Sequence, residues 1–226
     1  MLFRSTLAPS VALADDTSVA FNVGAVTDYR YRGISQTRLN PAVQGGIDLT
    51  LPMGFYAGTW ASNINFGTGG ANMELDVYGG YKFAAGPVNF DVGVIGYLYP
   101  GAADDGADLD YWEGYIKPSI ALSKEFTLGG AVYYSPEFTG ESGDATYVEV
   151  NGAYAVSPEL TFSGAVGMQT VETDGFFAGE DDYTTWNIGG TYTAMGLGFD
   201  LRYVGTDVDN APIYDDRFVF SIKKAL

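Results

Sequence analysis

The sequence predicts an all-β fold, a closed up-and-down antiparallel transmembrane barrel of about twelve strands. Three observations predict it. Apolar and polar residues alternate with period two along most of the chain. Short and long connections alternate between these segments, and the 226 residues include 31 Gly, 17 Tyr and 14 Phe, which suits sheets and turns better than helices. No stretch approaches the roughly 20 apolar residues of a membrane-spanning helix.

Composition excludes several functions. The chain has no His and no Cys, which removes His- and Cys-dependent nucleophiles, His-based zinc sites, thiolate sites and disulfides. Its formal net charge of −17 argues against nucleic acid as a partner, because phosphate binding needs basic patches. Carboxylate pairs could still serve acid–base chemistry, but carboxylates on one strand face are more often charge partners. We therefore expect no enzyme and no cofactor.

Residues 1–14 are interpreted as the remnant of a signal peptide. Arg4 supplies the positive region, residues 7–13 are moderately apolar, and Ala12-Leu13-Ala14 fits a small-x-small cleavage site. The alternative is a disordered tail. Residues 15–226 then form a single barrel domain, and export would direct it to the outer membrane of a Gram-negative bacterium.

The first strand is predicted over 19–31, where the polar residues fall mainly on even positions. The same alternation predicts further strands over 73–83, 88–99, 126–134, 146–154, 160–170, 186–192, 197–203 and 218–222. Three more strands fit between the connections that flank them. Pro118 falls inside the sixth strand, so we expect a bulge or a shifted boundary there, because proline cannot complete the hydrogen-bonded ladder.

Connections separate the two ends of the barrel. Five tight turns lie at 51–54, 85–87, 123–125, 156–159 and 194–196, and six long loops lie at 33–41, 65–71, 100–110, 136–145, 171–183 and 206–216. Outer-membrane barrels have short periplasmic turns and long extracellular loops. An even number of strands therefore places both termini at the short-turn, periplasmic end.

Phenylalanines recur at intervals of 34 to 37 residues, at Phe21, Phe55, Phe90, Phe126, Phe162 and Phe199. We expect one such ring per hairpin, at one height near the short turns. Other aromatic residues cluster where strands meet long loops: Tyr29, Tyr31, Tyr99, Tyr111, Trp112, Tyr133, Tyr134, Trp186 and Tyr203. Two aromatic girdles around an apolar band are typical of a barrel in a bilayer.

Charges decide which face is inside. The polar face carries eight acids and seven bases, a near balance that suits a wet lumen. The six long loops carry sixteen acids and one base, Arg38. These loops should form a negative extracellular vestibule that favours cations. The alternative of a soluble periplasmic β-sandwich that binds a ligand would place the apolar face inside.

Residues 28–63 carry a resemblance to a known family. The matching motifs are DYRYRGISQ at 28–36, PAVQGGID at 41–48 and GFYAGTWASN at 54–63, with ELDxYGGY at 74–81 and YWE at 111–113 further on. They resemble the TorF-family porins of proteobacteria. The resemblance implies an outer-membrane β-barrel with a channel role, and neither a defined substrate nor a catalytic set.

The candidate functional site is the lumen. We expect it to be lined by Asp28, Arg30, Arg32, Asp48, Glu74, Asp76, Lys82, Asp91, Glu113, Lys117, Glu149, Asp200, Arg202 and Arg217. Closure of the last strand on the first should gather Arg30, Arg32, Arg202 and Arg217 into a basic arc that forms the narrowest feature. Glu74, Asp76, Glu113 and Glu149 should lie across the barrel. Twelve strands leave a narrow interior, so these charges would control passage.

The function predicted is passive passage of small polar solutes or cations across the outer membrane. The alternative is a non-conducting structural or adhesive barrel, in which the same charges pair and fill the lumen. Expected partners are outer-membrane lipid and lipopolysaccharide, and no oligomeric state is specified. No metal site is expected; candidates for divalent-cation bridging to lipopolysaccharide are Asp104, Asp105, Asp108 and Asp110.

Overall fold

The computed structural model describes residues 17–67, 70–102 and 108–226. The expected signal-peptide remnant at 1–14 and the candidate ligands Asp104 and Asp105 lie outside these residues. Over the described chain, strands dominate, and the regular helical structure consists of one short 3₁₀ turn, η1 (Pro52–Gly54). No helix in this part is long and apolar enough to cross a membrane.

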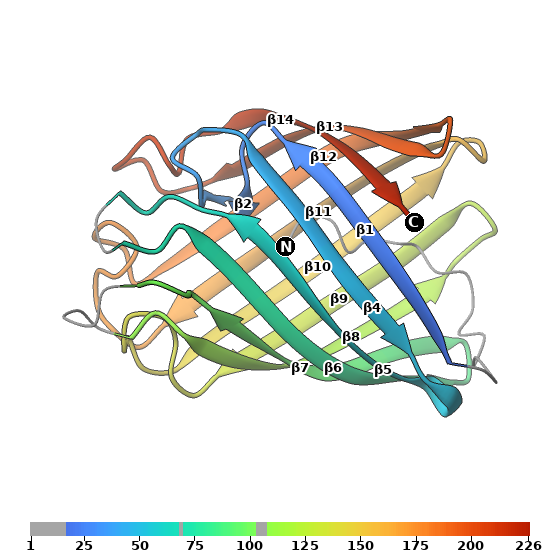
Figure 1. The fold of residues 1–226 in the computed structure, drawn as a ribbon, viewed down its shortest axis with the longest axis horizontal. Helices are drawn as coiled ribbons and strands as arrows, with labels where there is room; N and C mark the ends of the chain where they lie inside the picture. Colours follow the sequence, from blue (N-terminus) through green and yellow to red (C-terminus); the bar gives the residue numbers. More distant parts are fainter. Residues whose placement is uncertain (1–16, 68–69, 103–107) are drawn as a thin grey trace.

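Twelve antiparallel strands of the described chain close into a barrel, as the sequence predicts (Figure 1). They run in chain order around it, and the last strand, β14, pairs with the first, β1. The strands are β1 (Ser18–Val26), β4 (Ala42–Thr50), β5 (Phe55–Asn63), β6 (Met73–Ala85), β7 (Val88–Leu98), β8 (Tyr111–Ala121), β9 (Phe126–Ser135), β10 (Ala145–Ala155), β11 (Leu160–Val171), β12 (Asp182–Ala194), β13 (Leu197–Thr206) and β14 (Arg217–Ala225). Long loops gather at one end and tight turns at the other.

The predicted first strand is wrong over its last five residues. Strand β1 ends at Val26, and the chain then forms a separate two-stranded hairpin of β2 (Arg30–Tyr31) and β3 (Ile34–Ser35). Asp28, Arg30 and Arg32 therefore do not extend the wall. They belong to a connection that enters the barrel, and these three residues are 1 to 7% exposed.

The apolar face of the sheet points outward. In β10, Val148 and Val150 are 46% and 60% exposed, whereas their neighbours Tyr147 and Ala153 on the other face are buried. The remaining strands repeat this alternation, which is that of a lipid-facing barrel with a polar interior. The β-sandwich alternative is therefore wrong, since the strands form one closed sheet with its apolar side outside.

Of the two expected aromatic girdles, the one near the short turns faces outward as predicted, and the one near the long loops does so only in part. The six periodic phenylalanines all lie on the outward parity of their strands, in the half that ends in tight turns, as expected. At the long-loop end, Trp112, Tyr134 and Phe218 face outward and are about half or more exposed. Five predicted girdle members are instead turned inward: Tyr29, Tyr31, Tyr99, Tyr111 and Tyr133. Three of them, Tyr29, Tyr31 and Tyr133, also contact charged side chains of the lumen.

Pro118 causes neither a bulge nor a change in the boundary. The pairing of β8 with β9 runs through Ile116↔Val132, resumes at Ser119↔Gly129, and keeps the same register on both sides. On its other edge β8 pairs without interruption with β7, where Pro118 lies opposite Phe90. Proline therefore removes ladder bonds from one edge of one strand only.

Val150 tests the orientation of the barrel wall. It lies at the middle of β10 and faces outward. Val150→Arg should destabilise folding into lipid vesicles by about 2–4 kcal/mol, because an arginine there meets the hydrocarbon midplane. The control Tyr154→Arg, near the short-turn end of the same strand, should cost about 0–1 kcal/mol. Equal costs in urea titrations of the two variants would contradict the assigned lipid-facing band.

Candidate functional site

The hairpin β2–β3 is built by a two-residue turn. Tyr31 pairs with Ile34, and between them Arg32 and Gly33 have φ of 46° and 89°. Two successive positive φ angles are those of a type I′ turn, which matches the twist of a hairpin. Gly33 accepts this geometry without strain, whereas Arg32 does so at a cost that its other contacts must offset. The turn thus presents Arg32 at the tip of the hairpin.

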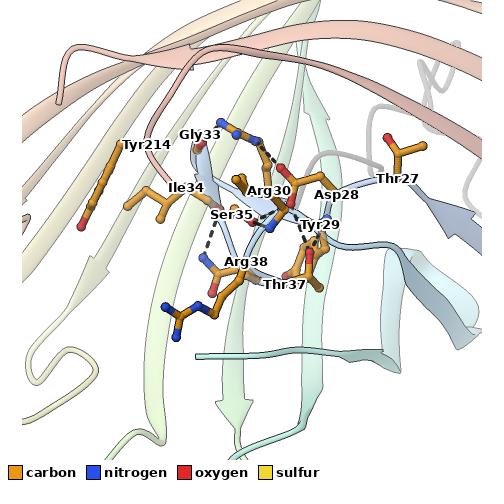
Figure 2. A network of polar contacts seen from close by, with 12 residues as sticks. Thr27, Asp28, Tyr29, Arg30, Gly33, Ile34, Ser35, Thr37, Arg38 and Tyr214 are labelled. Atoms are coloured by element: carbon orange, nitrogen blue, oxygen red, sulfur yellow. Dashed lines mark hydrogen bonds and ion pairs between the residues drawn. The ribbon is translucent and has the colours of Figure 1, made fainter. Parts of the chain in front are cut away.

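Asp28 organises the base of the hairpin (Figure 2). Its carboxylate accepts hydrogen bonds from Ser35 Oγ at 2.5 Å and Thr37 Oγ1 at 3.1 Å, and it pairs with Arg30 Nε at 2.8 Å. Arg30 Nη1 also donates to the carbonyl of Gly33 at 2.8 Å. This network ties both strands and the turn together, so the hairpin is a folded unit rather than a loose loop.

Arg32 reaches across the lumen to the far wall. Its Nη2 pairs with Glu113 Oε2 on β8 at 2.7 Å, and its Nη1 donates to Gln169 Oε1 on β11 at 2.6 Å. The hydroxyl of Tyr183 on β12 donates to the carbonyl of Arg32 at 3.0 Å. The guanidinium lies over the rings of Tyr31, Tyr133 and Tyr147, at 4.3 to 5.0 Å from their centroids. A connection between β1 and β4 is thereby fixed to the opposite side of the barrel.

Other contacts fix the sides of the hairpin. Tyr29 Oη donates to Glu74 Oε1 on β6 at 2.6 Å, and the backbone N–H of Ser35 donates to the carbonyl of Ile213 in the last long loop at 2.9 Å. Gly33 packs so closely that a Cβ there would lie 2.5 Å from both Thr185 Oγ1 and Thr206 Cγ2. The hairpin therefore occupies the lumen at the long-loop end.

Two pKa shifts agree with these roles. Burial and the neighbouring Glu74 carboxylate raise the pKa of Tyr29, so its hydroxyl stays protonated and donates. Burial by itself would lower the pKa of Arg32. Glu113, Tyr31 and Tyr97 together have a larger effect in the opposite direction, so the net pKa lies above its ordinary value. Arg32 therefore remains a cation at any physiological pH.

Tyrosine hydroxyls satisfy lumen carboxylates on the wall from β4 to β10. Besides the Tyr29–Glu74 bond, Tyr78 donates to Asp48 at 2.6 Å, Tyr97 to Glu113 at 3.1 Å and Tyr147 to Glu149 at 2.8 Å, and Tyr56 donates to Asp91. A hydrogen bond to a charged group contributes about 1.5–3 kcal/mol. These donors let acids stand on an enclosed wall without a cation at each one.

Glycines on neighbouring strands make room for these rings. A Cβ at Gly58 would lie 2.5 Å from Cζ and Oη of Tyr78, and one at Gly80 would lie 2.5 Å from Oη of Tyr56. Gly167 has the same relation to Tyr147. The rings lie flat against the wall because the residue beneath has no side chain, and this leaves the lumen wider than upright rings would.

Exposure differs along the barrel axis. Glu74, Asp76, Glu113 and Gln169, in the half that ends in long loops, are at most 1% exposed. Toward the short turns, the ion pair of Lys117 and Asp91 at 3.7 Å is about a quarter exposed. Lys82, whose Nζ lies 4.9 Å from the ring centroid of Tyr56, is exposed. The lumen is therefore accessible to solvent toward the short turns and filled by the hairpin and its partners toward the long loops.

Arg202 forms a second charged layer. Its guanidinium bonds to Asp200 at 3.1 and 3.2 Å, to Asn187 at 2.6 Å and to Ser163 at 3.0 Å, which links β11, β12 and β13. Arg217 faces inward on β14, and its buried Nε has no hydrogen-bond partner among the described residues.

The single basic arc that the sequence predicts is wrong. Arg202 and Arg217 lie on the β13–β14 wall, but Arg30 is taken up by Asp28 within the hairpin and Arg32 extends to Glu113 on the far wall. The error follows from the misplaced end of the first strand. The predicted acids Glu74, Asp76, Glu113 and Glu149 do lie across the barrel, on β6, β8 and β10.

Sequence reasoning missed Gln169, Tyr147 and Gly33. Gln169 lies on the inward parity of β11, and parity alone could have placed it in the lumen. Gly33 after Arg32 is a turn signal inside a stretch that otherwise alternates. No sequence signal reports that Arg32 and Gln169, separated by 137 positions, meet in space.

The candidate metal ligands Asp108 and Asp110 use their side chains in the loop itself. Asp110 Oδ1 accepts from the backbone N–H of Tyr99 at 2.7 Å, and Asp108 Oδ1 accepts from the N–H of Asp110 at 2.9 Å. Within the three described stretches, no group of three or more potential protein ligands could hold a metal ion.

Comparisons with known proteins agree with this architecture. Residues 12–226 match the family model described as bacterial protein of unknown function (Gcw_chp). No curated protein matches the chain. Among solved structures, the NanC porin has a TM-score of 0.61 at 13% identity over 92% of this chain and 98% of that one. The KdgM porin has 0.63 at 8% identity over 91% and 98%.

Two further structures complete the comparison. The COG4313 outer membrane channel from Pseudomonas putida F1 has a TM-score of 0.54 at 9% identity, over 97% of this chain and 98% of that one. A KdgM porin in complex with disordered oligogalacturonate has 0.61 at 7%, over 92% and 98%. At such identities the likeness establishes a shared fold, that of outer-membrane porins.

Gly58 tests the flat packing of the tyrosines. Gly58→Ala should push Tyr78 off the wall, break its bond to Asp48 and destabilise the barrel by about 1–3 kcal/mol. Gly114→Ala is the matched control, because a Cβ there meets nothing within 4 Å and should change stability by less than about 0.5 kcal/mol. Urea unfolding in detergent measures both. Indistinguishable midpoints would show that the rings do not depend on glycine.

Proposed function

Since this chain belongs to the Gcw_chp family of bacterial proteins and has the fold of outer-membrane porins, we propose that it is a narrow porin-like channel for small polar solutes or ions. The observation that carries the proposal is a closed barrel with an apolar exterior and charged side chains along its interior. The resemblance to TorF-family porins supports the same function. Passage requires no catalytic group, and none is assigned.

The hairpin β2–β3 sets the conducting state of this channel. It fills the long-loop end of the lumen, where the surrounding charges are almost fully buried, while the short-turn half remains wet. The docked hairpin corresponds to a closed or strongly restricted channel, and its displacement to an open one. Such a connection folded into the barrel needs no movement of the wall to change the width of the passage.

The acidic long loops favour cations. Exposed acids such as Glu141, Asp174 and Asp209 surround the entrance, and charge of one sign at a mouth raises the local concentration of counterions. An acidic entrance repels polyanions, so the entrance of this chain is not suited to a solute such as the oligogalacturonate of the KdgM complex. The shared fold does not carry over that solute.

A second candidate is a non-conducting barrel with a structural or adhesive role. It is favoured by the burial of Asp28, Arg30, Glu74 and Glu113, each at most 1% exposed. In that case the ion pairs simply fill the lumen, and lipid and lipopolysaccharide are its only partners. Conductance measurements separate the two candidates.

Gly33 tests the closure. Gly33→Ala places a methyl group against Thr185 and Thr206 at a residue with φ of 89°, so the hairpin should undock while the wall stays intact. In planar bilayers we expect the variant to show a larger conductance or a higher open probability than the wild type, with Gly114→Ala unchanged. If the wild type, Gly33→Ala and Gly114→Ala all show no conductance, the non-conducting barrel is favoured.

The vestibule is tested by reversal potentials. Under a salt gradient at low ionic strength, the open channel of Gly33→Ala should prefer cations. The preference should weaken as salt rises and the screening length falls below about 8–10 Å. Combining Glu141→Gln, Asp174→Asn and Asp209→Asn should reduce the cation preference at low salt. Anion selectivity at low salt would contradict the proposed role of the loops.

A further inference from the structure

Arg32 occupies a site whose walls are complementary to a planar cation. The guanidinium carbon lies 4.3 Å from the ring centroid of Tyr147 and 5.0 Å from that of Tyr133, within the range of cation–π attraction. Glu113 pairs with one terminal nitrogen at 2.7 Å, and the amide oxygen of Gln169 accepts from the other at 2.6 Å. The site thus offers two ring faces, one carboxylate and one amide oxygen.

Four barrel strands hold these groups independently of the hairpin. Glu113 lies on β8, Tyr133 on β9, Tyr147 on β10 and Gln169 on β11. Tyr97 donates to Glu113 at 3.1 Å, and Gln169 Nε2 donates to the carbonyl of Thr170 at 3.0 Å, which points its amide oxygen at the guanidinium. Only Tyr31, at 4.7 Å from the guanidinium carbon, leaves with the hairpin.

Arg32 is a tethered occupant rather than part of the wall. It is the first turn residue of the hairpin, with a φ of 46° that favours glycine or asparagine, so its backbone is better suited to another residue. Its side chain is 5% exposed, although it starts from a connection at the mouth of the barrel. Removing the hairpin would take the cationic partner away from Glu113 and leave its carboxylate facing the position of the guanidinium, which another cation can then occupy.

Resting on the channel function proposed above, we propose that Glu113, Tyr133, Tyr147 and Gln169 form a binding site for organic cations that carry a guanidinium or amidinium group, and that Arg32 closes the channel by occupying this site as an internal ligand. A free cation of this class binds only the undocked state and therefore shifts the population toward the open channel. The acidic loops concentrate such cations at the same end of the barrel.

Because Arg32 is tethered, the concentration of free cation needed to displace it can be estimated. A group held on a short connection has an effective concentration in the millimolar range. A free monovalent guanidinium compound must therefore reach millimolar concentrations to displace Arg32 in the wild type. Removal of the Arg32 side chain should tighten the apparent binding of the same compound at least about tenfold.

Arg32→Asn is the variant that tests the site, because Asn-Gly is a preferred type I′ pair and keeps the turn. The probe is methylguanidinium, followed by calorimetry of the full-length protein in detergent, with methylurea as the neutral probe of similar shape. We expect Arg32→Asn to bind methylguanidinium at least about tenfold more tightly than the wild type, with no binding of methylurea. Arg32→Asn combined with Glu113→Gln should lose the binding.

Arg202→Asn is the control, since the Arg202 guanidinium is held by Asp200, Asn187 and Ser163 instead of rings. Binding by Arg32→Asn that is no tighter than by the wild type or by Arg202→Asn, or equal binding of methylurea, would overturn the proposal. If Arg32→Asn fails to give a heat-resistant barrel on gels, Gly33→Ala takes its place, because it undocks Arg32 without removing it. Failure of that variant to bind more tightly than the wild type also overturns it.

Calorimetry separates this proposal from the channel function. Binding without any conductance in planar bilayers would refute the channel and leave the cation site intact. Conductance that methylguanidinium leaves unchanged, together with absent binding, would refute the cation site and leave the channel intact. In a conducting wild type, millimolar methylguanidinium should increase the open probability, and methylurea should not.

Discussion

A carboxylate enclosed by a barrel wall must find a hydrogen-bond donor, and this requirement shapes the lumen of the protein. Five acids that face inward between β4 and β10 accept a hydrogen bond from a tyrosine hydroxyl, as Asp48 does from Tyr78 and Glu113 from Tyr97. For three of these tyrosines, among them Tyr78, a glycine on the next strand provides the space that the ring needs beside the wall. At those three places the charge, the ring and the glycine form one structural unit.

Much of this fold could be predicted from the pattern of residues. Period two identifies nine of the twelve wall strands and their inward faces, and the positions of the turns and loops identify the other three. The same rule fails over 27–31, where Asp28, Tyr29, Arg30 and Tyr31 continue the alternation although the chain has left the wall. A short hairpin and a strand end share the same period, so only the turn at Arg32-Gly33 distinguishes them.

The candidate site was less accessible to prediction. Tyr111 and Glu113 are two residues apart on β8 and therefore face the same, inward side. The prediction that Tyr111 belongs to the outward-facing girdle is inconsistent with this alternation. Partner identity is a different matter, since it depends on the height of each residue in the barrel and on the stagger between strands. Arg32 contacts Glu113 and Gln169 because of that stagger and because the hairpin folds inward. Neither feature can be recognised from a local pattern in the sequence.

The long sequence separations of the hairpin contacts imply an order of events during folding. Arg32 bonds to Gln169, 137 residues away, and Tyr183, 151 residues away, bonds to Arg32. Contacts of such range form late, because the loop entropy is recovered only when the intervening strands are in place. Docking of the hairpin therefore waits until β8, β11 and β12, which carry its partners, are in place. The residues that plug the lumen belong to the first connection of the chain, but they reach their final positions only after most of the wall has formed.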